Sequence, residues 1–137
     1  IVKLINLSRH KQQLKVIMFD GITLAGFNLV DIEEVGKKTS LPVIVINRKI
    51  PNLEKVRDAL KNFDDFEKRW EIVLRAGKIK ECRVKNKKIY YQAFGLSDED
   101  AREIINITST RSLIPEPLRV AHLIATAIVR GESYGRA

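Results

Sequence analysis

The chain has 137 residues, a length typical of one domain, and 45% of them are hydrophobic and 31% charged, which excludes an intrinsically disordered composition. Its single cysteine excludes an internal disulfide and fits a reducing compartment, so we expect a cytoplasmic protein. No apolar run approaches the roughly 20 residues of a membrane-spanning helix, so no membrane partner is expected. The formal net charge of +8 favours a polyanion such as nucleic acid, although the solvated surface of a heat-stable protein would carry the same charge.

The first half of the chain is predicted to alternate helices with buried strands. Apolar residues recur at helical spacing in residues 1–12, and residues 30–38 form a second helix with acids near its start and lysines near its end. Short apolar runs at 15–19 and 42–46 are typical of strands covered on both faces. This order predicts an α/β layer with at least two parallel strands. Two strands do not make a stable sheet, and the chain opens in mid-pattern without methionine, so we expect further strands upstream of Ile1.

Four further helices are predicted after the second strand. Helices are expected to begin at Pro51 and Ser97 and to cover residues 66–75 and 115–130. Proline suits the first position of a helix because its missing N–H has no partner there. Ser97 followed by Asp100 is close to a capping box, and Gly77 is a plausible end for the helix over 66–75.

Two runs, at 79–85 and 88–94, flank Asn86-Lys87 and predict a β-hairpin at the side of the sheet. The hairpin carries three aromatic residues, Tyr90, Tyr91 and Phe94. We expect these rings to pack in the core, the alternative being a surface on which bases stack. Cys82 lies in the same hairpin without a histidine nearby in sequence, so it is expected to be a packed thiol rather than a nucleophile.

The first candidate site residue is Asp20, where the apolar run at 15–19 ends. Ligands of open α/β sheets bind beyond the carboxyl ends of strands, and a carboxylate there suits Mg²⁺, which takes oxygen ligands. The alternative is that Asp20 only caps a turn. Gly21 and Gly26 would either let a ligand approach the backbone closely or only allow tight turns.

Two bases, Arg48 and Lys49, follow the second predicted strand. If the two strands are parallel neighbours, these bases lie at the same sheet edge as Asp20. An acid for a metal beside bases for phosphate is the arrangement of phosphoryl-transfer sites. The alternative is that both bases only end a strand in solvent.

The segment 111-RSLIPEPLRVAHLIATAIVRG-131 is the most specific string of the chain. Helical spacing puts His122 on an apolar stripe with Leu118 and Val129, next to the face of Arg119. A lone histidine on such a stripe is usually a hydrogen-bonded core residue. The alternative is that His122 points into a site beside Arg119 and orients a phosphate or a water.

Three strings together resemble the endonuclease V superfamily: VIMFDG at 16–21, LPVIVINR at 41–48 and PEPLRVAHLIA at 115–125. More closely, nearly the whole chain resembles the archaeal endonuclease dU family. The resemblance implies a ribonuclease-H-like α/β fold, with a mixed central sheet flanked by helices, in which residues 1–137 form one domain that lacks its N-terminal strands. It also implies hydrolysis of DNA near a deaminated base, deoxyuridine or deoxyinosine, with Mg²⁺ or alternatively Mn²⁺ as cofactor.

The resemblance also assigns roles. Asp20 matches the family acid of the strand-end D-G motif and would bind the metal, and His122 matches the histidine of the third string, so these two are the expected catalytic residues. The residues expected to contact nucleic acid are Arg48, Lys49, Arg111, Arg119, Gly21 and Gly26. The other acids of the metal cluster are expected upstream of Ile1. Two alternatives stay open: a non-catalytic nucleic-acid-binding domain of the same fold, whose affinity would depend on salt, and a domain for a small molecule or protein partner.

Overall fold

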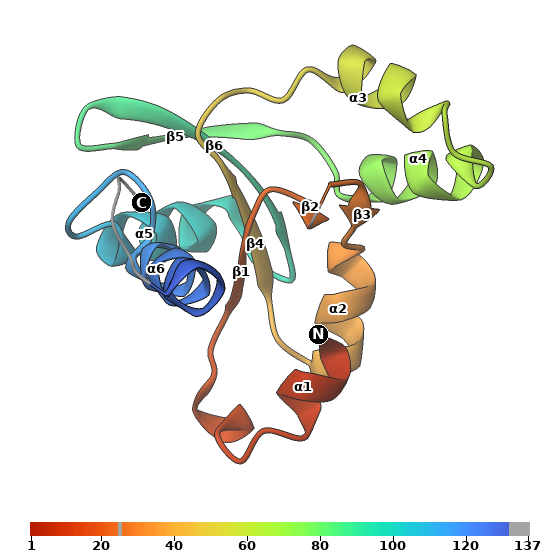
Figure 1. Ribbon diagram of the computed structural model, residues 1–137. Helices are drawn as coiled ribbons and strands as arrows, with labels where there is room; N and C mark the ends of the chain where they lie inside the picture. Colours follow the sequence, from red (N-terminus) through yellow and green to blue (C-terminus); the bar gives the residue numbers. More distant parts are fainter. Residues whose placement is uncertain (25, 132–137) are drawn as a thin grey trace.

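The computed structural model describes residues 1–24 and 26–131 and has a four-stranded mixed sheet at its centre (Figure 1). The strands lie in the order β1 (Ile17–Asp20), β4 (Val43–Asn47), β6 (Lys87–Phe94) and β5 (Lys80–Val84). β1 and β4 are parallel, as predicted, whereas β6 is antiparallel to both β4 and β5. The hairpin expected at the side of the sheet therefore completes it, because β6 pairs with β4 as well as with its own partner.

Helices cover both faces of the sheet, which confirms a mixed sheet flanked by helices; the finer ribonuclease-H-like assignment stays a prediction. The helices are α1 (Val2–Asn6), η1 (Lys11–Gln13), α2 (Ile32–Thr39), α3 (Leu53–Leu60), α4 (Phe66–Arg75), α5 (Asp98–Thr108) and α6 (Glu116–Arg130), and a small ribbon pairs β2 (Thr23–Leu24) with β3 (Asn28–Leu29). α2 lies on one side of the sheet and α5 and α6 on the other, while α3 and α4 extend beyond the end of β4 (Figure 1). Among the described residues, none of these helices combines the length and apolar character needed to cross a membrane.

β4 forms the centre of the core. Ile44 and Ile46 are fully buried in the cluster under α5, and Val43 and Val45 are fully buried in the cluster under α2. Successive side chains of a strand point to opposite faces, so a strand covered on both faces needs apolar residues throughout. This requirement explains the unbroken apolar run of the sequence.

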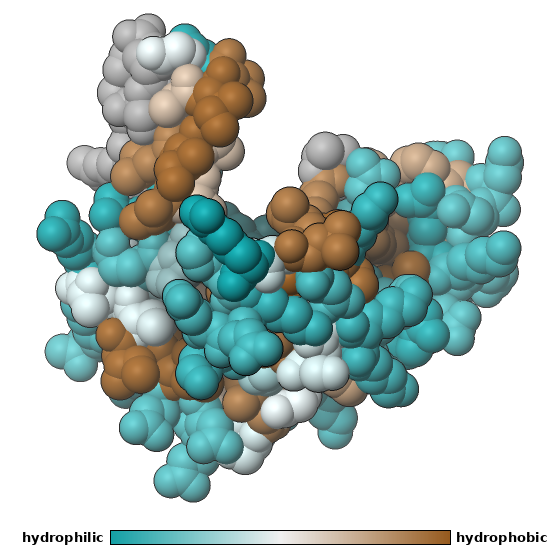
Figure 2. All heavy atoms as spheres, turned by 90° about the horizontal axis from the view of Figure 1, so that it is seen from below, coloured by the Kyte–Doolittle hydropathy of each residue, from teal (hydrophilic) through white to brown (hydrophobic). Residues whose placement is uncertain are grey.

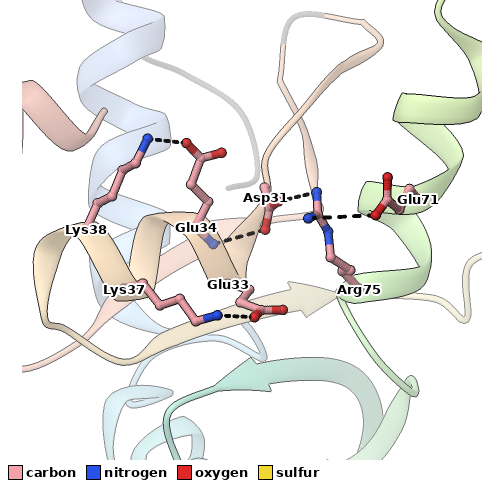
Figure 3. Close-up of polar contacts among 7 residues, drawn as sticks. All are labelled: Asp31, Glu33, Glu34, Lys37, Lys38, Glu71 and Arg75. Carbon is pink, nitrogen blue, oxygen red and sulfur yellow. Dashed lines mark hydrogen bonds and ion pairs between the residues drawn. The ribbon is translucent and has the colours of Figure 1, made fainter.

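Charged side chains fix the start of α2 (Figure 3). Asp31 caps the helix by accepting a hydrogen bond from the backbone N–H of Glu34 at 3.0 Å, and its other oxygen lies 2.7 Å from Arg75 of α4. Further pairs join Glu33 to Lys37, Glu34 to Lys38 and Glu71 to Arg75. Since each cation of this cluster has a carboxylate partner, the cluster stabilises helices and leaves no open charge for a ligand.

Two local predictions were wrong in detail. Asn52, not a first-turn Pro51, sets the start of α3, because its side chain accepts a hydrogen bond from the N–H of Lys55 at 3.0 Å. The hairpin turns at Lys85-Asn86, one residue before the predicted place, with φ of 48° and 63°. A two-residue hairpin turn needs positive φ at both central positions, and asparagine tolerates this conformation well. The helix predicted over 66–75 is confirmed as α4.

Candidate active site

The predicted acid and bases lie at one edge of the sheet, where β1 and β4 both end. Asp20 pairs in register with Ile46, and the N–H of the next residue, Gly21, donates to the carbonyl of Ile46 at 2.9 Å. Arg48 and Lys49 follow directly after β4. Asp20 and both bases are exposed. The predicted parallel pairing therefore brings an exposed carboxylate and two exposed cations to the same edge.

Asp20 belongs to the face of the sheet that α5 and α6 cover. Met18 packs against the cluster under α5, as does Leu118 from the first turns of α6. Since side chains alternate along a strand, Asp20 lies on the same face as Met18. His122 follows Leu118 by one helical turn, on the same side of α6.

His122 is exposed, so the interpretation as a buried core histidine is wrong. The physical reason is that no other described element covers α6: none of its residues is buried, and four of its large apolar side chains are exposed. These four are Val120, Ile124, Ile128 and Val129, which are between 41% and 82% exposed. In Figure 2 the apolar side chains of the helix form a column that stands out from the body of the molecule.

A small cavity of about 100 Å³ opens on the opposite face of the same edge. Val56 of α3 and Val73 of α4 contribute to its apolar wall, and Asn47 and Gln92 contribute two side-chain amides. The amide nitrogen of Gln92 donates to the carbonyl of Gly77 at 2.8 Å, which holds the side chain in place. Gly21 also lines the cavity. No local sequence pattern predicts this cavity, because α3 and α4 form it by folding over a sheet edge.

The other two arginines predicted to contact nucleic acid differ in whether their charge already has a partner. Arg111 is exposed in the loop between α5 and α6. Arg119 is half-buried and holds the carboxylate of Glu116 with hydrogen bonds of 2.8 to 3.1 Å. This pairing lowers the pKa of Glu116 and raises the pKa of Arg119, so the charge of Arg119 is already matched within α6.

The glycines at the edge act first as turn residues. Gly21 has φ of 76° and Gly26 has φ of 91°, a region that residues with a Cβ rarely adopt. A Cβ would meet nothing within 4 Å at Gly26, and its nearest contact at Gly21 would be the side-chain oxygen of Asn47 at 3.8 Å. Backbone conformation rather than crowding therefore explains both glycines.

Two side chains of the hairpin, Tyr91 and Cys82, pack in the core as predicted. Tyr91 is fully buried, which confirms core packing for this ring, and Tyr90 and Phe94 are half-buried. Cys82 is buried and accepts from the side-chain amide of Asn106 at 3.5 Å. Burial raises the pKa of the Cys82 thiol, so it is a packed side chain rather than an activated nucleophile.

No group of three or more histidine, cysteine or acidic side chains that could hold a metal occurs in the part of the chain that the structure describes. Asp20 offers one exposed carboxylate at the sheet edge. Mg²⁺ retains several waters and is often bound by one or two carboxylates together with substrate phosphate. A single carboxylate therefore suits this ion as a partial site, completed by other oxygen ligands.

Comparison with known proteins gives a consistent family assignment. A family described as Endonuclease dU matches residues 1–129. A protein of Methanosarcina mazei called "UPF0215 protein" is 55% identical over all of this chain and 71% of its own length, and one of Methanothermobacter thermautotrophicus with the same name is 50% identical over all of this chain and 67% of its own length. A crystal structure of a protein of unknown function from Archaeoglobus fulgidus is similar with a TM-score of 0.87 and 38% identity, covering 95% of this chain and 73% of that one.

Proposed function

The chain belongs to the endonuclease dU family, and on that premise we propose that it takes part in metal-dependent hydrolysis of DNA phosphodiester bonds near a deaminated base, deoxyuridine or deoxyinosine. The observation that carries the proposal is the exposed carboxylate of Asp20 at the shared carboxyl edge of β1 and β4, the edge at which Arg48 and Lys49 follow β4. An acid that can hold a metal next to cations that can hold phosphate is the equipment that phosphodiester cleavage needs.

Asp20 is the residue that would hold Mg²⁺ or Mn²⁺, together with water and substrate oxygens. When bound, such an ion supplies a positive charge beside the scissile phosphate and lowers the pKa of water. Arg48 and Lys49 would bind the phosphates on either side and so fix the register of the strand. His122 would orient a water or a phosphate from the α6 side, which its exposure and its place one turn after Leu118 support.

The cavity behind Asp20 supports recognition of a base near the cleaved bond. Apolar walls exclude water from a flat ring, and the amides of Asn47 and Gln92 can both donate and accept hydrogen bonds. Enzymes that read a damaged base extrude it from the stack into such a pocket. A substitution that fills this space, Val73→Phe, is therefore expected to lower discrimination between lesion and normal duplexes.

The proposal is tested by nicking of labelled duplexes that carry deoxyuridine, deoxyinosine or no lesion, with Mg²⁺, Mn²⁺ or EDTA. Asp20→Ala is expected to lower nicking by at least about 10²-fold, since it removes a metal ligand from the reacting centre. Asp64→Ala is the matched control, because it removes one exposed carboxylate from the turn between α3 and α4. Equal nicking by both variants would exclude Asp20 from the chemistry.

One observation favours a second candidate, a non-catalytic DNA-binding domain of the same fold: the described residues contain no cluster of three metal ligands. This candidate predicts salt-dependent binding of duplex DNA in EDTA and no nicking with either metal. The same assay separates the two, since only the nuclease responds to metal and to Asp20→Ala.

A further inference from the structure

We propose that the tip of the β5–β6 hairpin and the loop between α5 and α6 form one surface that binds the phosphate backbone of DNA beside Asp20. We call this surface the hairpin platform; its residues are Lys85, Asn86, Lys87 and Arg111. The inference rests on the proposed function, because it states how the backbone of that substrate is held at the same sheet edge.

The hairpin extends beyond the edge at which β1 and β4 end. Asn47, the last residue of β4, pairs with Tyr90, whereas β6 already begins at Lys87, three residues before it. At about 3.4 Å per residue, the tip overhangs the end of β4 by about 10 Å. Phosphates of one DNA strand repeat about every 3.4 Å along the helix axis, so the overhang spans about three of them. β6 also lies two strands, about 10 Å, across the sheet from β1, so the tip is on the order of 14 Å from the end of β1, which a DNA strand spans with about four phosphate repeats.

A hydrogen bond joins the two parts of the platform. The ammonium of Lys85 donates to the carbonyl of Thr110, and this contact brings the next residue, Arg111, beside the hairpin tip. Figure 1 shows the hairpin turn and the α5–α6 loop on the same side of the molecule. The tether holds the loop to the tip, so the cations do not have to be ordered when DNA binds.

Lys87 of the platform faces the same side of the sheet as Asp20. Lys87 pairs with Val84, which is buried in the cluster under α5, so Lys87 also lies on the face that α5 and α6 cover. Within the described residues, neither Lys87 nor Arg111 forms an ion pair, and both are exposed. The charge of Lys87 is therefore available for phosphate, whereas that of Arg111 also acts on the nearby carboxylate of Glu116, whose pKa it helps to lower.

Acidic residues are gathered at the opposite edge. The first turn of α5 contains Asp98, Glu99 and Asp100. This turn follows the end of β6 at Phe94, which pairs with Val43 at the amino end of β4. Near the platform, the carboxylate of Glu116 is already held by Arg119. The three acids of α5 therefore lie at the far end of the sheet from the platform, and one of them, Asp98, is paired with Lys80, so they do not oppose the charge of the platform.

The test measures binding of an undamaged duplex in EDTA, by fluorescence anisotropy over a series of salt concentrations. The double variant Lys85→Gln/Lys87→Gln is expected to weaken binding and to reduce the magnitude of the slope of log K against log salt. The reduction should be about 0.9 from Lys87, whose charge is unpaired, and up to about 0.9 more from Lys85, whose ammonium also holds the carbonyl of Thr110. The matched control is Lys3→Gln/Lys15→Gln, which removes the same charge from α1 and from the segment before the amino end of β1. The control is expected to keep the wild-type slope.

Equal slopes for the wild type and the hairpin variant would overturn the platform. It would also be overturned if the control variant lost as much slope as the hairpin variant, because the loss would then reflect total charge rather than this surface. Because Lys85 also holds Thr110, the substitution of Lys85 could loosen the α5–α6 loop. The single variant Lys87→Gln leaves that hydrogen bond in place and therefore tests the platform by itself. Its slope is expected to be smaller in magnitude than that of the wild type by about 0.9. Binding in EDTA does not require cleavage. If the wild type binds DNA through the platform but never nicks it, the proposed nuclease function is wrong and the platform stands. If the wild type nicks DNA and the hairpin variant binds as well as the wild type, the platform is wrong and the nuclease function stands.

Discussion

Two helices of this chain, α2 and α6, reverse the usual relation between apolar character and burial. α2 has a charged sequence, IEEVGKKT, yet four of its eight residues are buried. α6 is longer and more apolar, EPLRVAHLIATAIVR, yet none of its fifteen residues is buried. Both helices contact the central sheet, α2 at β4 and α6 at β1.

The difference lies in how each helix meets the sheet. α2 lies along it, with its side chains in the cluster that contains Val43 and Val45, and its charged side chains pair along the outer face (Figure 3). α6 reaches the core mainly through Leu118, and its later apolar side chains stand out from the body (Figure 2). Burial is therefore set by where the fold places a helix, and hydrophobicity alone does not predict it.

The largest expected difference between the two helices is in the free energy of unfolding when one isoleucine of each is replaced by alanine. Ile32 of α2 is 2% exposed and Ile128 of α6 is 79% exposed. Ile32→Ala should lower the free energy of unfolding by about 2 to 5 kcal/mol, because it leaves a cavity. Ile128→Ala should change it by less than about 0.5 kcal/mol. Urea unfolding measures both.

A large cost for Ile128→Ala would mean that α6 is packed in solution against something else. In that case the cost should depend on protein concentration if a second copy covers the helix, because association links stability to concentration. A cost that is independent of concentration would contradict the exposed position of Ile128 in the monomer.

A second contrast uses glycine and alanine: both exchanges, Gly36→Ala in α2 and Ala127→Gly in α6, should destabilise the protein, but for different reasons. A Cβ at Gly36 of α2 would lie 2.4 Å from the Phe94 ring and 3.3 Å from the carbonyl of Leu41. Gly36→Ala should therefore destabilise by about 1 to 3 kcal/mol through overpacking, despite the better helix propensity of alanine. At exposed Ala127 of α6, propensity alone acts, so Ala127→Gly should cost about 1 kcal/mol. If Gly36→Ala instead raised the thermal midpoint, α2 would have room to move away from β6.

Much of the fold could be predicted from the sequence because local rules and tertiary packing agree there. The unbroken apolar run of β4, the cap residue Ser97 and the charges of α2 each place an element within about two residues of its observed bounds. The parallel pairing of β1 and β4 follows from the helix between them. That pairing was enough to predict that Asp20 and Arg48 share an edge.

The remainder depends on contacts between distant parts of the chain. Helical spacing put His122 on an apolar stripe, but spacing does not tell whether another element covers the stripe, and here none of the described residues buries it. Likewise, the pairing of Tyr90 with Asn47 sets how far the hairpin overhangs the edge, and a register between distant strands leaves no local signal in either one. The tether from Lys85 to Thr110 and the cavity beside Gly21 arise in the same way.

The smallest expected effect concerns the charges at the start of the two helices. Asp31 caps α2, whereas the N-cap residue of α6, Pro115, provides no side-chain cap, and the first turn of α6 has instead the pair between Glu116 and Arg119. The pKa of Glu116 is lowered, chiefly by the hydrogen bond from Arg119. A lowered pKa in the folded state means that the pair stabilises the protein above the ordinary pKa of glutamate, and that this contribution is lost as the pH falls through the lowered value.

Glu116→Gln should therefore destabilise the protein slightly at neutral pH, and the difference from the wild type should vanish in acid. The loss should be small because the pair is partly solvated. Urea unfolding of both proteins at several pH values below neutrality measures it, and a difference that grows toward acid would have the wrong sign for this pair. The variant also frees the guanidinium of Arg119. Tighter binding of DNA by Glu116→Gln would then indicate that Arg119 can contact phosphate once its partner is removed, whereas unchanged binding would leave that edge to Arg48, Lys49 and the hairpin platform.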